Sequence, residues 1–134
     1  YLFKQGDEGQ SAYLLISGTV NVVINEKSVG GISEGEIFGE LSLILGETRK
    51  ASIKAVVPCE LVEIKPAAFE ELLLSSNLKL HKVIRSIAEE LGKESGYSLP
   101  ISQKDLENLV TDAPDVVRAM ALQLHHRLSQ MIYS

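Results

Sequence analysis

The chain has 134 residues, of which 45% are hydrophobic and 23% are charged. This is the composition of one globular domain with a short appendage, and it excludes a disordered or fibrous chain. The formal net charge of −5 excludes the strongly basic surface typical of a nucleic-acid-binding protein. No apolar run approaches the roughly 20 residues that a membrane-spanning helix needs, so we expect no membrane segment in this chain.

The single cysteine, Cys59, excludes an internal disulfide and a metal site built from cysteines. A lone thiol in a strand run fits the core of a protein in a reducing compartment, so we expect a cytoplasmic protein. The chain starts at Tyr1 without a signal-like segment, and we interpret it as a fragment of a longer protein.

Up to about Lys65 the sequence predicts short strands. Its apolar runs are rich in β-branched residues and are separated by glycines, as at Ser17-Gly18. Many short strands with turn signals between them indicate a sandwich or a barrel rather than a parallel sheet with crossover helices. The runs cover residues 13–16, 20–24, 29–32, 36–38, 51–57 and 60–65.

The segment between Gly39 and Gly46 breaks this pattern. Its sequence, ELSLIL, neither alternates nor contains a turn signal. A glycine on each side predicts a single short helix wedged between strands.

After Lys65 the apolar spacing becomes helical. Pro66 suits the first position of a helix, which residues 75–77 interrupt. The same three residues offer an N-cap to a second helix, which we expect to end near Leu91. A polar loop follows to Pro100, and Ser102 can cap a further helix. Residues 112–114 interrupt this helix before a last helical run over 116–131.

The two helical pairs align with each other at a shift of 37 residues. The alignment places Phe69 on Leu106 and Leu91 on Leu128, and it preserves the apolar pattern better than the residue identities. One interpretation is a duplicated hairpin, such as the end of a second domain that is otherwise lost. The other is that any two amphipathic hairpins would align this well.

The segment from Phe38 to Ser52 carries the chemistry. Gly39 permits a close backbone approach in front of the predicted helix, whose first amides, at Leu41 and Ser42, have no partner within the helix and form an anion site. Arg49 adds a planar fork suited to phosphate. Glu40 adds an acceptor for a hydroxyl, so the helix amides, Arg49 and Glu40 together could hold a ribose phosphate. The alternative is that Glu40 and Arg49 form a purely structural ion pair.

The string FGELSLILGETRKAS closely resembles the phosphate-binding cassette of cyclic nucleotide-binding domains. This family includes protein kinase A regulatory subunits, cyclic nucleotide-gated channels and bacterial catabolite activators. The resemblance continues through the turn KQGDEG, the strand pair YLLISGTV, the entry GEIF and the helix FEELL, and it covers residues 1–91 in the expected order.

The resemblance implies a mainly β fold, an eight-stranded double-sheet jelly roll with a short cassette helix and C-terminal helical hairpins. It implies a cyclic nucleotide-binding domain over residues 1–91. Residues 92–134 would form a loop and a helical hairpin that serves as a cap, a homodimer surface or the remnant of a second domain.

The resemblance also implies a role for each residue of the cassette. Glu40 would accept from the ribose 2′-hydroxyl, and Arg49 would pair with the cyclic phosphate. Apolar strand residues would line the base, and the candidates to cover it are Leu91, Tyr97 or a residue of the C-terminal tail. The predicted ligand-binding residues are Gly39, Glu40, Leu41, Ser42, Arg49, Lys50 and Ala51, and the residues expected to line the base are Val20, Val22 and Ile37.

The predicted function is a regulatory domain that binds a cyclic nucleotide, cAMP rather than cGMP, and transmits binding to a fused or partner output domain. Lys50 departs from the family pattern, where alanine accompanies cAMP and a hydroxyl residue accompanies cGMP, so the choice of base stays open. The alternative is a ligand-free domain of the same fold that serves as a protein-interaction scaffold.

Other functions lack support in the sequence. No nucleophile motif or poised general base is present, so we expect no enzyme activity. A metal-binding cupin would need histidines on strands, whereas His81, His125 and His126 lie in predicted helices, with His81 expected to be exposed. The tail carries no basic recognition helix, so we expect no direct nucleic-acid contact.

Overall fold

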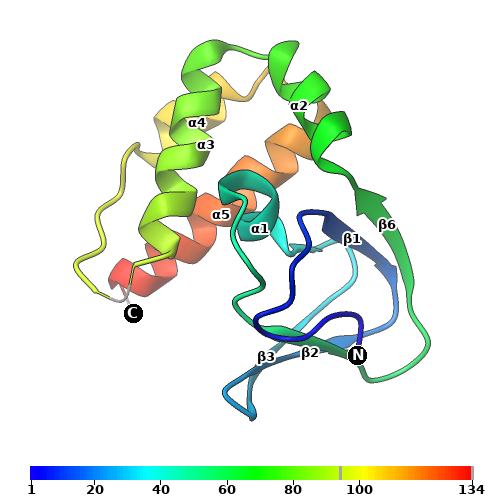
Figure 1. Cartoon of the computed structure of the whole chain (residues 1–134). Coiled ribbons are helices and arrows are strands. Elements are labelled where there is room, and N and C mark those ends of the chain that lie inside the picture. Colours follow the sequence, from blue (N-terminus) through cyan, green and yellow to red (C-terminus); the bar gives the residue numbers. More distant parts are fainter. Residues whose placement is uncertain (94, 134) are drawn as a thin grey trace. The chain divides into compact units, whose positions relative to one another are not determined.

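A computed structural model describes residues 1–93 and 95–133, and the chain divides into two units, Tyr1–Pro66 and Ala67–Ser134. The first unit contains the strands β1 (Ala12–Ser17), β2 (Val20–Ile24), β3 (Lys27–Ile32), β4 (Ile37–Phe38), β5 (Ser52–Ala55) and β6 (Glu60–Ile64). The short helix α1 (Glu40–Leu45) lies between β4 and β5 (Figure 1).

The six strands form two antiparallel sheets of three strands each. One sheet has the order β4-β1-β6 and the other the order β3-β2-β5. All six runs predicted from the sequence are found as strands, and the run over 51–57 is the one most shortened, to Ser52–Ala55. The strand pattern and the C-terminal helices agree with the predicted class, but the count of eight strands is not confirmed, because six are found in the described residues.

The segment before β1 explains part of this difference. It is held by an isolated antiparallel bridge between Phe3 and Ile53 rather than by a continuous ladder. A glycine at position 6 and a turn in which Lys4 and Asp7 hydrogen-bond to each other follow directly, and they prevent a longer strand. The resemblance predicted more strands than these residues can pair.

The hairpin between β2 and β3 turns through Asn25 and Glu26, both at positive φ (50° and 68°). This is the geometry of a two-residue turn whose twist matches that of the flanking strands. Gln5 holds the turn, because its Oε1 accepts from the Asn25 amide (2.9 Å) and its Nε2 donates to Asn25 Oδ1 (3.1 Å).

The core of the first unit lies between the two sheets. Its buried apolar members come from β1, β2, β3, β4 and β5, which shows that both sheets contribute one face. They are Leu15, Val20, Ile32, Phe38 and Ile53. Cys59, predicted in a strand, lies just before β6 and is half-buried against this core.

The second unit is helical, with α2 (Pro66–Leu74) entering it from the end of the first unit, followed by α3 (Leu78–Leu91), α4 (Gln103–Leu109) and α5 (Asp115–Tyr133). The predicted caps are present: Asn77 Oδ1 accepts from the Lys79 amide (2.8 Å), and Ser102 Oγ accepts from the Asp105 amide (3.2 Å). Helix α5 packs on α3 and on α4.

Candidate functional site

Polar burial in the first unit is concentrated around α1. Among the described residues, four polar or charged side chains are buried, and three of them are Glu40, Ser42 and Arg49, at 4%, 3% and 5% exposure. Charged residues are almost never this deeply buried without a specific partner or role. The burial therefore marks this part of the first unit as the candidate site.

Helix α1 begins at a terminus that is open to an anion. Gly39 precedes the helix in the left-handed conformation, at φ 77°, and as the N-cap residue it has no side chain that could cap this terminus. Gly46 ends the helix after six residues, with its amide bonded to the Ser42 carbonyl oxygen. The first amides of a helix have no carbonyl partner in the helix, so those of Leu41 and Ser42 have no intrahelical acceptor.

Arg49 is held in place by the loop that precedes β1. The Arg49 amide donates to the carbonyl oxygen of Asp7 (2.9 Å), and its carbonyl oxygen accepts from the Gly6 amide (2.8 Å). Ser52 Oγ accepts from the Gln5 amide (2.8 Å) a few residues further on. These bonds fix the Arg49 backbone against residues 5–7, which are far away in sequence.

The guanidinium of Arg49 is only partly satisfied. Nη1 donates to the carbonyl oxygen of Gly39 at 3.2 Å, whereas the buried Nε has no hydrogen-bond partner among the described residues. Nε and Nη2 face Gly9, where a Cβ atom would lie 3.3 and 3.2 Å from them. The edge that carries Nε and Nη2 is the one that grips a carboxylate or phosphate with two parallel hydrogen bonds.

Aromatic rings hold the guanidinium from the side. Its Cζ lies 4.1 Å from the centroid of the Phe3 ring and 6.0 Å from that of Tyr13. The rings of Tyr13 and Phe38 stack at 5.6 Å, and this links the arginine contact to the core. Burial lowers the pKa of Arg49, and the nearby Tyr13 and the carboxylates of Asp7 and Glu40 offset part of this effect.

The arrangement combines a buried guanidinium, one of whose nitrogens lacks a partner, with a helix N-terminus and a buried carboxylate. A buried donor without a partner is rare in proteins and requires an explanation, such as a ligand that supplies the acceptor. An anion between Arg49 Nε and the amides of α1 would be that acceptor. Glu40 adds an acceptor for a hydroxyl group, so the chemistry suits an anion that also carries a hydroxyl.

The predicted site residues differ in how the structure places them. Gly39, Glu40, Leu41, Ser42 and Arg49 gather at the front of α1 and the loop after it. Lys50 points away: it is exposed and pairs with Glu47 at 2.9 Å, the solvated arrangement. Ala51 is half-buried just before β5.

Two of the three residues expected to line the base do not fit that role. Val20 and Ile37 are 0% and 2% exposed and have no accessible surface to offer a ligand. Both belong to strand positions that face inward, which the sequence run alone could not indicate. Val22, which is half-buried, is the member of the set with accessible surface.

Sequence reasoning missed Phe3 and Gly9 as site residues. Both precede β1 and become neighbours of Arg49 only through the bridge of Phe3 to Ile53 and the turn over residues 4–7. The sequence did contain a signal for Gly9, since KQGDEG resembles the first β-turn of the family. Nothing in the sequence indicated that this glycine faces the arginine.

The histidines lie in helices as predicted, with one correction. His81 was expected to be exposed, but it is half-buried and its Nε2 hydrogen-bonds to the Leu73 carbonyl oxygen at the end of α2. His125 is buried, with Nε2 2.8 Å from the Ile101 carbonyl oxygen. Within the described residues no group of three or more His, Cys, Asp or Glu side chains could hold a metal ion.

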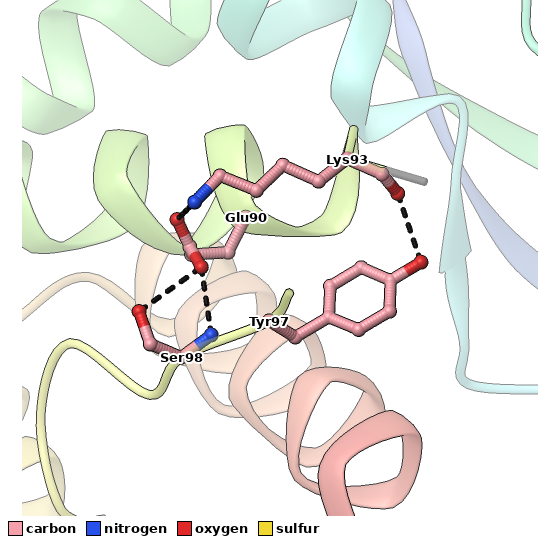
Figure 2. Close-up of polar contacts among 4 residues, drawn as sticks. All are labelled: Glu90, Lys93, Tyr97 and Ser98. Atoms are coloured by element: carbon pink, nitrogen blue, oxygen red, sulfur yellow. Dashed lines mark hydrogen bonds and ion pairs between the residues drawn. The ribbon is translucent and has the colours of Figure 1, made fainter. Parts of the chain in front are cut away.

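Tyr97, a candidate to cover a base, belongs to the loop after α3. Its hydroxyl donates to the Lys93 carbonyl oxygen (2.8 Å), as Figure 2 shows. The carboxylate of Glu90 accepts from the amide and hydroxyl of Ser98 (2.8 and 3.1 Å) and pairs with Lys93 (2.5 Å). The tyrosine is thus anchored within the second unit.

The comparison with protein families shows which family the chain belongs to. A profile described as "Cyclic nucleotide-binding domain" matches residues 1–76, which is more than half of the chain. The chain belongs to the cyclic nucleotide-binding domain family. The matched residues include the whole first unit and α2, and therefore Gly39, Glu40 and Arg49.

Solved structures of other cyclic nucleotide-binding proteins resemble the chain. The cAMP-bound and cGMP-bound forms of the EAL enzyme Bd1971 are each 27% identical, with a TM-score of 0.60 over 66% of this chain and 25% of theirs. cAMP-bound PfPKA-R is 30% identical, with a TM-score of 0.52 over 69% of this chain and 34% of its own. The chain thus spans a quarter to a third of these relatives.

The structures of these relatives contain cAMP or cGMP. The family is a regulatory, ligand-binding one. Among the described residues, no helix is both long and apolar enough to cross a membrane.

Proposed function

We propose that this domain binds a cyclic nucleotide through the front of α1 and Arg49. In this proposal the cyclic phosphate accepts hydrogen bonds from Arg49 Nε and Nη2 and from the amides of Leu41 and Ser42, and Glu40 accepts from the ribose 2′-hydroxyl. The observation that supports it most is the buried Nε of Arg49 without a hydrogen-bond partner among the described residues, near a helix terminus that begins at Gly39.

We further propose that cAMP is preferred to cGMP. Guanine carries an exocyclic amino group that needs an acceptor. The residue after Arg49 is Lys50, whose ammonium group has donors and no acceptor and is engaged by Glu47. The cassette therefore supplies no hydroxyl at this position to favour guanine over adenine.

The output would be a change in α1 and in the helix that follows β6. A nucleotide that binds more tightly to one position of this six-residue helix would shift the helix toward that position. A fused or partner domain that contacts the moving helices could then detect the shift. The domain itself would bind and signal without catalysing a reaction.

The experiment is thermal unfolding with and without saturating cAMP or cGMP. A ligand at one hundred times its Kd stabilises the folded state by about 2.7 kcal/mol, which for a domain of this size raises Tm by roughly 10 °C or more. We expect a larger shift with cAMP, its loss in Arg49→Gln, and its retention in Arg85→Gln, an exposed arginine on α3.

The competing function is that of a ligand-free interaction scaffold. The contact of Arg49 Nη1 with Gly39 and the stacking on Phe3 favour it, because they satisfy part of the guanidinium internally. The scaffold predicts no shift with either nucleotide in wild type. An equal shift in wild type and Arg49→Gln would show that a nucleotide binds elsewhere.

A further inference from the structure

The two helical hairpins of the second unit share their spacing. Helices α4 and α5 begin at Gln103 and Asp115, each 37 residues after the first residues of α2 and α3, Pro66 and Leu78. This is the same shift at which the sequence aligns with itself. Both helices of the pair therefore start in register with their counterparts.

The buried positions of the hairpins also coincide. Helix α2 buries Phe69 and α4 buries Leu106, which is 37 residues later. Helix α3 buries four residues, and the position 37 residues after each of them is buried in α5. The pairs are Leu80 and Val117, Ile84 and Ala121, Ile87 and Leu124, and Ala88 and His125.

The agreement extends to every buried position of α3. Helix α5 has 19 residues and buries six of them, and four of those six lie 37 residues after the four buried residues of α3. Its two further buried residues, Met120 and Leu128, correspond to Val83 and Leu91, which are half-buried in α3. The buried residues of the two helices thus occupy equivalent positions.

These equivalent helices are in contact with each other, since α3 packs on α5. Figure 1 shows both helices running toward the same end of the second unit, as the two halves of a parallel symmetric pair would. An interface in which a surface meets its own equivalent is isologous, and such a surface is self-complementary.

We infer that α4–α5 is an internal copy of α2–α3, and that it covers on α3 a self-pairing face that otherwise fits a second copy of this chain. The partner for this face is therefore α3 of another molecule. Within one chain, α5 is always close to α3 and has a high effective concentration, so it excludes the second copy. The chain consequently does not pair through α3 while α5 is docked.

The test is the molecular mass in solution of variants of the full chain. Ala121→Glu places a carboxylate on the buried face of α5, whereas Ala119→Glu makes the same change at an exposed position two residues away. By sedimentation equilibrium at tens of micromolar, we expect Ala121→Glu to double in mass relative to wild type and Ala119→Glu to match wild type.

A double variant separates specific pairing from general exposure of apolar surface. Ile84→Glu combined with Ala121→Glu disables both faces, so the mass should return to that of wild type. If Ala121→Glu loses its helical circular dichroism, Leu128→Glu disrupts the same face nearer the end of α5. The inference would be overturned if a folded Ala121→Glu or Leu128→Glu variant, with α5 released, kept the mass of wild type. It would also be overturned if the variant aggregated and the added Ile84→Glu change did not reverse this.

Discussion

The guanidinium of Arg49 lies over the ring of Phe3, with its Cζ atom 4.1 Å from the ring centroid. The ring reaches this position because Phe3 forms a bridge with Ile53, in the strand that follows the arginine loop; the Ile53 amide donates to the Phe3 carbonyl oxygen at 3.0 Å. A cation–π contact becomes stronger when the pair is removed from water, and here Arg49 is buried while Phe3 is partly buried.

Replacing Phe3 by leucine should therefore weaken nucleotide binding. Leucine keeps the apolar volume but removes the ring face that holds the guanidinium in place. The contact contributes about 1–2 kcal/mol at most, so the increase in Kd should not exceed about 5- to 30-fold. Isothermal titration calorimetry with cAMP measures the change. Phe3→Tyr keeps the ring and should bind within about threefold of wild type; equal affinity of the leucine variant would show that the ring only fills space.

Gly39→Ala should damage both stability and binding. The residue has φ 77°, and a Cβ atom would lie 2.8 Å from Arg49 Nη1 and 3.2 Å from the Ser11 carbonyl oxygen. The strained backbone alone costs about 1–2 kcal/mol, which lowers Tm by roughly 3–10 °C in a chain of this size, and the displaced guanidinium lowers affinity further.

Gly30→Ala is the matched control for this change, because a Cβ atom there meets nothing within 4 Å. Its Tm and its affinity for cAMP should both stay near those of wild type. A Gly39→Ala variant that unfolds at a lower temperature but binds cAMP normally would show that Gly39 is needed for folding alone.

Lys50 should affect the choice of base more than the affinity for the phosphate. Its exposed ion pair with Glu47 contributes at most about 1 kcal/mol, so Lys50→Ala should leave the Kd for cAMP within about fivefold. Lys50→Thr introduces a hydroxyl acceptor, and it should lower the Kd for cGMP relative to that for cAMP. Competition between the two nucleotides measures this ratio, and a loss of cAMP binding in Lys50→Ala would instead place the ammonium on the phosphate.

The Glu90 network should make the loop after α3 sensitive to acid. The hydrogen bond from Lys93, followed by that from the Ser98 amide, holds the pKa of Glu90 below its ordinary value of 4.5. Since the folded pKa is lowered, the contribution to stability is present above the unfolded pKa and is lost as the pH falls through the folded one. The Tm difference between wild type and Glu90→Gln should therefore disappear as the pH falls below the folded pKa of Glu90.

Glu89→Gln is the control for this pH dependence, since Glu89 is exposed and pairs with Arg85 at 3.2 Å. Its Tm difference from wild type should be small throughout. A carboxyl resonance of Glu90 that titrates at or above 4.5 would contradict the assigned cause.

Much of the local structure was predictable from the pattern of neighbouring residues in the sequence. The six apolar runs became the six strands, and Gly39 and Gly46 bounded α1, because a glycine at positive φ determines where such a short helix begins and ends. The caps at Asn77 and Ser102 were predictable for the same local reason. The resemblance added two strands that the described residues do not form.

The sequence by itself determined the cassette and the family: FGELSLILGETRKAS places a helix terminus, a carboxylate and an arginine within a few residues of one another. Only the tertiary structure decided which atoms of Arg49 are satisfied, because Phe3, Gly9 and Gly39 approach it from three separate segments. It also decided that Val20 and Ile37 face the core, since the choice of face in a strand depends on how the two sheets pack and not on the strand alone.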